Sequence, residues 1–563
     1  LQGTPSIFAP GLDQDGHGTH VMGIEAGNGR CGAGYTGVAP AASIVFTKIS
    51  FGSDFGTDIM LDGVNYIFKK AEELGMPAVV NLSLGYNAGS HDGTSVACQA
   101  IDALTGPGKI IVNSAGNSAY QEDSSGKRYY QHVGFEATED EQMFDMMVYH
   151  TGVIELWYEP PGNIDVAVSA FDFWTGGHVE RSDFVSPGES VSNQGFYDGS
   201  EIASYSIDAT EMSNENNGAR HVIITITPQF WTYYFYNWTI VVKGDCYFDA
   251  WPGESGYVLF MDERPGVRGG DSRLSLTYPA YAKEVIAVGS YVTKNVWYDV
   301  YGRRQTDWNA EVGKISYFSS QGPSRRPDIT GPKPEIVAPG QYIASAFSAQ
   351  TYAMGPDNYD TEMLTHSYYY WLAAGTSMSS PHVAGAVGLL LQCNPSLTPD
   401  DIEQILAQSA LSDEYTGTGH NDVYGYGKLD IQAALKAIDT GGQNELGLDL
   451  QADYPVYDAS DTLEIYAQAA NAGAERGVDF GMAIVQPDGS LLYYPNWTAD
   501  YAVTGLYLPT RFSVQDLLVF ECEVQQGAPL SESGNYIVFA AFLDQSSGTI
   551  LGNLSATTFE VDM

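Results

Sequence analysis

The stretch TSMSSPHVAGAVGLLLQ, residues 376–392, joins a polar start to a long apolar run rich in Gly and Ala. A segment that is apolar on all sides predicts a buried helix. Ser377 stands where that helix is expected to begin, and there the free N–H groups and the helix dipole favour negative charge. Pro381 fits a first turn, because N–H groups there have no helical partner. The stretch therefore predicts a serine at the start of a buried helix, and a serine that acts as a nucleophile needs a base beside it.

The composition indicates a large acidic protein with more than one domain. The chain has 563 residues, of which 44% are hydrophobic, so it can form a large core and is expected to divide into about two to four units. It has 25 Lys and Arg against 69 Asp and Glu, which gives a net charge of −44. Such a surface repels nucleic acid and anionic membranes, and we expect neither as a partner.

The cysteines and the apolar runs exclude further classes. The five cysteines are widely spaced and form no CxxC pair, so neither a disulfide framework nor a zinc site is predicted. No run approaches the ~20 apolar residues of a membrane span. No signal peptide precedes LQGTPSIFAPG at residues 1–11, and we expect a processed or truncated chain.

Two regions, residues 1–117 and 277–440, alternate between strand and helix patterns. Such alternation predicts a parallel sheet covered by helices, the α/β class. The expected strands are ASIVFTKI (42–49), PAVVNLSLG (77–85), KIIVNSAGN (109–117), KEVIAVGSYV (283–292) and KPEIVAPG (333–340), and the expected helices cover 58–75, 91–104, 398–411 and the stretch after Ser377.

Two other regions have a β texture. Residues 118–276 are rich in aromatic and β-branched residues, with recurring turns such as EPPGN and WPGESG, and they predict an inserted, jelly-roll-like antiparallel β-sandwich. A Gly-rich stretch, DTGGQNELG, then leads into residues 441–563, which have the texture and size of a C-terminal β-sandwich domain.

Three segments in sequence order resemble the histidine, oxyanion and serine segments of the subtilisin-like serine proteases. They are DGHGTHVMG (15–23), SAGNS (114–118) and GTSMSSPHVAG (375–385). GVAP (37–40), YFSSQGP (317–323) and VAPG (337–340) are also similar to segments of that family. The resemblance covers about residues 13–117 and 277–440, and it implies a subtilisin-like parallel sheet flanked by helices. The two β-rich regions indicate a larger, bacterial-type member.

The resemblance implies a catalytic serine at Ser377 and His17 as its general base and then acid. It implies that the side-chain amide of Asn117 and the backbone N–H of Ser377 bind the oxyanion. Removal of one such donor typically lowers the rate by a factor of about 10²–10³. It also implies two edges of a primary specificity pocket, Ser83–Leu84–Gly85 and Ser114–Ala115–Gly116, and the small residues there favour a large apolar substrate side chain. His20 and His382 are interpreted as packing residues.

The aspartate of the expected triad has no counterpart in the sequence. The family carries it on an apolar strand upstream of the histidine, followed by a D-[ST]-G turn, and only 16 residues precede His17. Asp13 and Asp15 lie too close to His17 along the chain, and Asp15 is expected to cap the helix of His17. Two interpretations remain open: the aspartate lies on an upstream segment or a separate N-terminal fragment, or the protein is a pseudoenzyme, because a triad without its carboxylate loses orders of magnitude in activity.

Two further departures concern the insertion and calcium. The insertion of residues 118–276 resembles sandwich insertions of larger bacterial subtilases, including those similar to spore-germination proteases, and either rigidifies the protein or takes part in substrate selection or prodomain docking. The loop after the His17 helix, NGRCGAGYTG, is poor in carboxylates, so the calcium site often found there in the family is not assigned. No cofactor or metal is required by the sequence, and calcium elsewhere is left unlocated.

We therefore expect a secreted or cell-surface serine endopeptidase that acts on polypeptide substrates through an acyl-enzyme at Ser377. The C-terminal sandwich is expected to serve stability, assembly or attachment. Two alternatives remain: a catalytically inactive scaffold with the subtilase fold that binds peptides or partners, and an exopeptidase of the tripeptidyl-peptidase type.

Overall fold

The protein is described from a computed structural model, which forms two compact units, residues 1–438 and 439–563. The described residues of the first unit are 13, 15–30, 35–49, 56–172, 177–211, 217–229, 235–253, 257–349, 351, 360–365 and 369–438, and those of the second are its strands.

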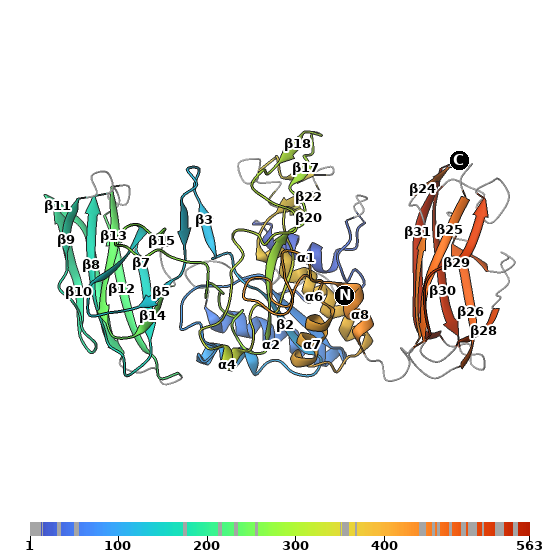
Figure 1. Ribbon diagram of the computed structural model, residues 1–563, viewed down its shortest axis with the longest axis horizontal. Helices are drawn as coiled ribbons and strands as arrows, with labels where there is room; N and C mark the ends of the chain where they lie inside the picture. The colour runs from blue at the N-terminus through green and yellow to red at the C-terminus, as the bar shows by residue number, and fades with distance from the viewer. Residues whose placement is uncertain are drawn as a thin grey trace. The chain divides into compact units, whose positions relative to one another are not determined.

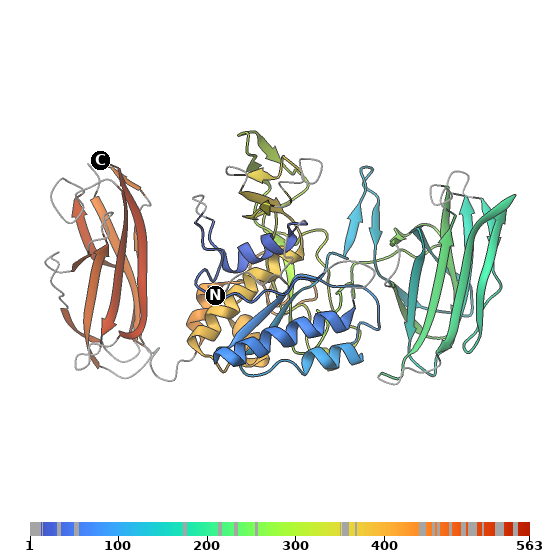
Figure 2. The same ribbon diagram turned by 180° about the vertical axis from the view of Figure 1, so that it is seen from behind.

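A parallel sheet lies at the centre of the first unit (Figures 1 and 2). Its strands follow the order β1 (Ala78–Leu82), β2 (Lys109–Ser114), β16 (Val285–Val292) and β19 (Ile336–Gln341), and every neighbouring pair is parallel. Alternate residues of a strand point to opposite faces. Ile110 and Val112 therefore pack with helix α6, and Ile111 packs with α2 and α3 on the other side. The helices are α1 (His17–Ala26), α2 (Thr57–Leu74), α3 (Val96–Asp102), α4 (Pro327–Thr330), α6 (Thr376–Cys393), α7 (Pro399–Ser409) and α8 (Ile431–Ala437).

One predicted strand does not form. Residues 42–49 lie outside every sheet and run beside α2, where Gly63 faces Thr47. Ile44 and Phe46 are 46% and 56% exposed. Strand β1 ends the sheet on its side, so the apolar pattern of residues 42–49 has no strand with which to pair. Strand propensity depends on packing against neighbours, and among the described residues this segment has no such neighbour.

The inserted region is an antiparallel sandwich of two sheets. One sheet has the order β10-β11-β12-β7-β14-β5 and the other β3-β4-β15-β6-β13-β8-β9, with an apolar core between them that includes Phe144, Trp238 and Phe248. The strands are β3 (Tyr120–Glu122), β4 (Arg128–Tyr130), β5 (Val133–Glu136), β6 (Gln142–Tyr149), β7 (Gly152–Tyr158), β8 (Ile164–Asp172), β9 (His178–Arg181), β10 (Ser190–Asp198), β11 (Ser200–Glu211), β12 (Arg220–Pro228), β13 (Tyr236–Gly244), β14 (Tyr247–Pro252) and β15 (Tyr257–Met261).

A buried charge network joins this sandwich to the core. Arg325, in a core loop, donates to Asp249 of β14 at 2.9 Å and to Glu159 at 3.0 Å. His132, only 1% exposed, lies between Asp249 and Asp271, at 3.2 and 2.9 Å. Burial opposes a charge on this imidazole, but the two carboxylates outweigh it and raise the pKa of His132 to about 9. Removing one partner from such a network would leave a buried charge unpaired, so the network fixes the sandwich on the core.

A small β-rich arm extends from the core beside α1 (Figure 1). It contains a hairpin and a three-stranded sheet of order β20-β22-β21, and Trp297 stacks on Tyr342 between them. The strands are β17 (Val296–Tyr298), β18 (Arg304–Thr306), β20 (Ile343–Ala346), β21 (Leu364–Thr365) and β22 (Tyr370–Ala373).

The second unit is entirely β in its described residues. It has two sheets, of orders β23-β25-β29 and β24-β31-β30-β26-β27, with β28 paired to β26. Its strands are β23 (Leu446–Ala452), β24 (Val456–Asp458), β25 (Thr462–Asn471), β26 (Arg476–Val485), β27 (Leu491–Tyr493), β28 (Thr504–Leu508), β29 (Phe512–Glu523), β30 (Gly534–Leu543) and β31 (Ile550–Asp562).

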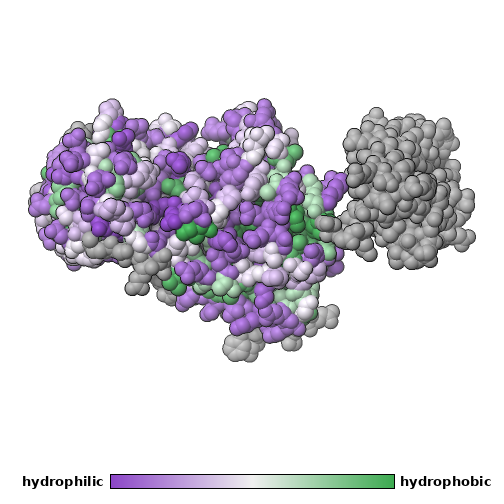
Figure 3. All heavy atoms as spheres, turned by 60° about the horizontal axis from the view of Figure 1, so that its bottom comes forward, coloured by the Kyte–Doolittle hydropathy of each residue, from purple (hydrophilic) through white to green (hydrophobic). Residues whose placement is uncertain are grey.

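The predicted fold class is confirmed: a helix-flanked parallel sheet carries an inserted sandwich, and a second β unit follows it. The face of the first unit in Figure 3 is covered mainly by hydrophilic residues, with smaller hydrophobic patches between them. Within the described residues, the helices are too short or too polar to cross a membrane.

Candidate active site

Ser377 lies at the start of α6, as predicted, but Pro381 does not lie in the first turn. The helix begins at Thr376, so Pro381 is its sixth residue and stands inside the helix. A proline there removes the N–H that would bond the carbonyl four residues earlier, which is that of Ser377. The carbonyl of Ser377 instead accepts a 2.8 Å hydrogen bond from the hydroxyl of Ser83.

The end of β1 holds the start of α6 through further side chains. Asn81 donates to the Ser83 hydroxyl at 3.0 Å and accepts from the Ser380 hydroxyl at 2.6 Å. The hydroxyl of Ser377 donates to the carbonyl of Ser83 at 3.4 Å. Ser377 and Ser83 are therefore joined in both directions, and a strand end and a helix start meet at the serine.

Asn117 follows the end of β2 and faces the same helix start. Its side-chain oxygen accepts from the backbone N–H of Thr376 at 2.9 Å and from the Thr376 hydroxyl at 3.0 Å. These two donors fix which end of the amide is oxygen, so Nδ2 remains to donate. The N-cap residue Gly375 has φ +153°, and a Cβ there would lie 3.4 Å from Nδ2. The residue that sequence reasoning missed is Thr376, although the G-T-S motif contains it.

His17 is the first residue of α1, and α1 packs directly against α6 through Val21, Ile24 and Met378. The N-cap residue is Gly16, whose φ of +89° favours glycine. Burial lowers the pKa of His17, and the negative charges of Asp15 and Asp13 partly oppose this. The His17 ring makes no hydrogen bond with any described residue.

The two nearby aspartates serve the helix rather than the ring. Asp13 accepts from the N–H of Gly16 at 2.9 Å and from the N–H and hydroxyl of Thr19 at 2.8 and 2.6 Å. Asp15 accepts from the N–H of His17 at 3.1 Å. Asp15 was expected to cap the helix and accepts one backbone N–H. Asp13 accepts two backbone N–H groups and one hydroxyl there, so it supports more of the first turn.

The two predicted pocket edges lie after the ends of β1 and β2 but differ in their backbone bonding. Ser114, Ala115 and Gly116 are buried, and core segments bond both N–H and C=O of Ala115 and of Gly116. Ser83 and Leu84 are half-buried and Gly85 is exposed. Within the described part of the chain, the backbone groups of Leu84 and Gly85 make no hydrogen bonds.

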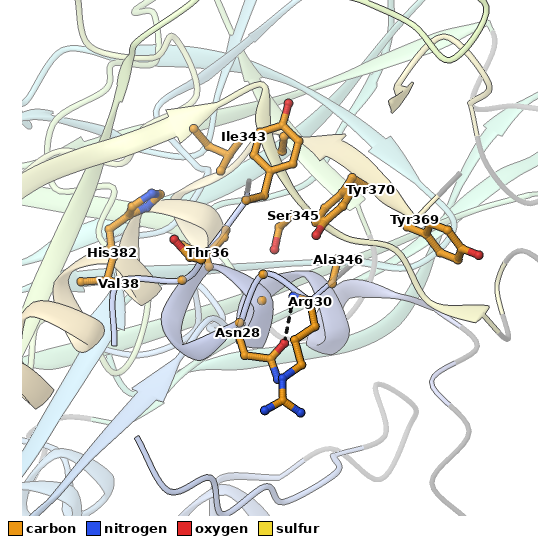
Figure 4. A pocket seen from close by; sticks show the side chains of 17 residues that line it. Asn28, Arg30, Thr36, Val38, Ile343, Ser345, Ala346, Tyr369, Tyr370 and His382 are labelled. Atoms are coloured by element: carbon orange, nitrogen blue, oxygen red, sulfur yellow. Dashed lines mark hydrogen bonds between the residues drawn. The ribbon is translucent and has the colours of Figure 1, made fainter. Parts of the chain in front are cut away.

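The ring nitrogens of the histidines interpreted as packing residues contact backbone carbonyls. The Nε2 of His20 contacts the carbonyls of Ile343 and Trp371 at 3.0 and 2.9 Å, and burial lowers its pKa to about 4. His382 Nδ1 contacts the carbonyl of Met378 at 2.8 Å. His382 also lines a cavity of about 260 Å³, shown in Figure 4, between the end of α1 and β20. No predicted catalytic or substrate-binding residue lines that cavity.

Among the described residues, no group of three or more His, Cys, Asp or Glu side chains is arranged to hold a metal ion. The arrangement that the structure does provide is a hydroxyl at a helix start, an oriented amide and, on an adjacent helix, a histidine whose pKa burial lowers. Such a set of groups suits acyl transfer.

The chain is similar to known proteins in sequence and in fold. A sequence model of the subtilase family matches residues 5–215 and 263–427, more than half of the chain. The chain belongs to the subtilase family. The solved structure of the CspB protease of Clostridium perfringens aligns with a TM-score of 0.56 at 25% identity and covers 76% of this chain and 82% of that one.

Curated relatives match shorter stretches. Bacillopeptidase F of Bacillus subtilis (strain 168) is 36% identical over 159 residues, which are 27% of this chain and 10% of that protein. Serine protease AprX of the same strain is 30% identical over 188 residues, 33% of this chain and 36% of that protein. The chain therefore spans well under half of either relative's length.

Proposed function

We propose that the protein is a serine endopeptidase that cleaves polypeptides through an acyl-enzyme at Ser377. His17 takes the proton of the Ser377 hydroxyl while Oγ attacks the scissile carbonyl carbon. Nδ2 of Asn117 and the N–H of Ser377 bind the oxyanion. The intermediate then collapses, the peptide C–N bond breaks, and His17 gives the proton to the leaving amine. Water attacks the acyl-enzyme with the same residues in reversed roles and releases the second product.

The observation that carries this proposal is the oriented amide of Asn117 beside the helix start. The oxygen of this amide accepts two hydrogen bonds, and both donors belong to Thr376, the neighbour of Ser377. Two donors from one residue fix the orientation of the amide relative to the helix start. With its oxygen bonded in this way, the amide keeps its Nδ2 group, which lies 3.4 Å from the position of a Cβ on Gly375, available as a donor. Preorganised donors of this kind are usually the largest single contribution to such a reaction.

We further propose different roles for the two pocket edges. In the Ser83–Gly85 edge, the backbone groups of Leu84 and Gly85 make no hydrogen bonds with described residues, and they would pair with an extended substrate segment. Ser114–Gly116 has its backbone bonded to the core and would form a wall of the primary pocket. The small side chains of both edges leave room for a large apolar residue.

The triad carboxylate is proposed to come from an apolar strand outside residues 13–117, on an upstream segment or a separate N-terminal fragment. Three observations support this. Asp13 and Asp15 are engaged by backbone N–H groups. Among the described residues, strand β1 ends the parallel sheet, and the strand-like segment 42–49, which runs beside α2, is unpaired. A strand that paired with the outer edge of β1 would extend the sheet and carry the carboxylate at its end.

Active-site labelling tests the proposal. The full-length protein, with any fragment that co-purifies, is treated with a fluorophosphonate probe, and mass spectrometry locates the adduct. We expect labelling of Ser377 that disappears in Ser377→Ala and is slowed by Asn117→Ala. A lack of labelling in protein that also contains the aspartate segment would contradict the proposal and favour the inactive scaffold.

Blocked and free peptides separate the remaining alternative. An endopeptidase cleaves substrates with acetylated N-termini as readily as free ones, whereas a tripeptidyl-peptidase requires the free amine. We propose secretion or attachment to the cell surface as the location, with the second β unit in a role of stability, assembly or attachment. Detection of the protein in culture supernatant or cell-wall fractions tests the location.

A further inference from the structure

The loop that continues the Ser83–Gly85 edge, residues 86–93, is held by the inserted sandwich at several points. The N–H of Gly89 donates a 3.0 Å hydrogen bond to Glu155 of β7. His91 stacks on Trp251 of β14 with ring centroids 4.1 Å apart and planes 5° apart. Asn217 of the insertion donates to Asp92 at 2.5 Å. The sandwich therefore holds this loop together with the core, which bonds it at Tyr86, Ala88 and His91.

One residue of the loop, Asn87, also contacts the segment of the oxyanion donor. Its side-chain oxygen accepts from the hydroxyl of Ser118 at 3.1 Å, and its side-chain nitrogen donates to Gln131 of the sandwich. Its backbone carbonyl contacts Nε2 of His91 at 2.5 Å. Burial lowers the pKa of His91 to about 4, so this ring is neutral at pH 7 and keeps one N–H to donate.

Ser118 is the residue that follows Asn117, so its position affects the amide that is proposed to bind the oxyanion. Its N–H donates to the hydroxyl of Ser320 at 2.9 Å, and its side chain is buried. Ser118 is thus held by the core through its backbone and by Asn87 through its side chain. Asn117 itself is exposed and, among the described residues, is fixed through Thr376 and through its neighbours in the chain.

We propose that Asn87 is a positioning residue for the oxyanion donor Asn117, and that the inserted sandwich supports it through Gln131. The contacts run from Gln131 to Asn87, from Asn87 to Ser118, and along the chain to Asn117. This proposal rests on the proposed function, in which Asn117 binds the oxyanion. It gives the insertion a specific role, because the sandwich then orients a transition-state contact without touching the substrate.

The test compares kcat, KM and inhibition by a peptide boronic acid, which forms a tetrahedral adduct on serine, in variants of the full-length protein. We expect Asn87→Ala to lower kcat about tenfold, since small displacements of catalytic groups have large effects on rate. KM should change by less than about twofold, and the boronate Ki should rise by about the same factor as kcat falls, because the lost contact is made only to the tetrahedral state.

Two further variants separate positioning from general stability. Asn87→Asp keeps an oxygen for the Ser118 hydroxyl, and Gln131 can turn its amide nitrogen toward the carboxylate, so we expect kcat within about threefold of the wild type. Gln131→Ala removes only the sandwich contact and should lower kcat by an intermediate factor. Gln121→Ala is the matched control, because Gln121 accepts a 2.6 Å hydrogen bond from Tyr257 within the same sandwich. It should leave kcat and Ki unchanged.

Asn117→Ala is measured in parallel so that the two proposals fail separately. A loss of about a hundredfold in Asn117→Ala together with an unchanged kcat in Asn87→Ala overturns the positioning role and leaves the proposed function intact. An unchanged kcat in Asn117→Ala removes the oxyanion role and the positioning role with it. A lower melting temperature in Asn87→Ala, with a kcat that Asn87→Asp does not restore, also overturns the inference. If Asn87→Ala does not fold, the kcat and Ki of Gln131→Ala decide the question.

Discussion

The two helices that meet at the site, α6 and α1, are supported very differently. The start of α6 is joined to the end of β1 through Ser83 and to the segment after β2 through Asn117. The start of α1 is held by Asp13 and Asp15 on its backbone, while the His17 ring makes no hydrogen bond with a described residue. Among the described residues, the serine side of the site is therefore held by several side-chain contacts, whereas the His17 ring is held by no hydrogen bond.

This difference follows from the strand order of the sheet, which determines where the loops after the strands lie. The ends of parallel strands lie at one edge of a sheet, so each strand delivers the loop that follows it to a common place. Strands β1 and β2 deliver Ser83 and Asn117 there. Among the described residues, no strand pairs with the other edge of β1, so no further loop is delivered to this place from that side.

The largest expected effect tests whether both halves act as one unit. Ser377→Ala and His17→Ala should each lower kcat by about 10⁴ or more, because each group is useless without the other. The double variant should lose no more than either single variant. Turnover of a fluorogenic peptide measures this, with His178→Ala, at an exposed histidine of β9, as the control. A double variant with the product of the two losses would show that the residues act independently.

Removal of the proposed oxyanion donor, Asn117, should have the next largest effect. This change affects the residues around Ser377 and leaves those around His17 in place. Asn117→Ala should lower kcat by about 10²–10³ with little change in KM, because the amide is expected to bind only the tetrahedral state. Asn28→Ala, at an exposed amide beyond the end of α1, provides a matched control measured in the same steady-state assay. A rise in KM with kcat unchanged would instead assign Asn117 to substrate binding.

A smaller effect is expected from the bond that replaces the missing N–H of Pro381. Ser83→Ala leaves the carbonyl of Ser377 without its donor, and an unsatisfied buried acceptor costs about 1 kcal/mol or somewhat more. We expect a matching fall in the free energy of unfolding in urea and a loss of severalfold in kcat. Ser409→Ala, which removes a 2.7 Å hydroxyl bond to the carbonyl of Ile405 in α7, should lower stability without affecting kcat.

The sequence predicted much of this architecture because the buried strands and helices carry periodic apolar patterns. The strands at 109–117 and 283–292 and the helix after Ser377 lie where they were expected. The predicted strand at 42–49 was wrong for a physical reason. Its pattern is that of a sheet strand, but pairing depends on a neighbour that the pattern itself does not contain.

Contacts between distant segments could not be predicted in the same way. The serine and histidine segments were recognisable as motifs, whereas the bond from Ser83 to Ser377 joins residues 294 positions apart. The contact of Asn87 with Ser118 and Gln131 depends on how the sandwich sits on the core, which no local pattern encodes. The structural effect of Pro381 depends on which residue begins the helix. Because α6 begins at Thr376, Pro381 lies inside the helix and not in its first turn.

The smallest effect concerns the pH dependence of the histidine side. A general base must be neutral, so activity falls as pH drops through the pKa of His17. Burial lowers this pKa below its ordinary value of about 6.5, and the acid limb of kcat/KM should therefore lie below that pH when no carboxylate bonds the ring. A triad aspartate bonded to the ring stabilises its charged form and should move the acid limb to higher pH.

NMR titration of the His17 ring, whose signal is identified by its loss in His17→Ala, measures the same pKa directly. A midpoint above about 6.5 in residues 1–563 alone would mean that the ring already has a carboxylate partner within this chain, and the two halves of the site would then be equally complete.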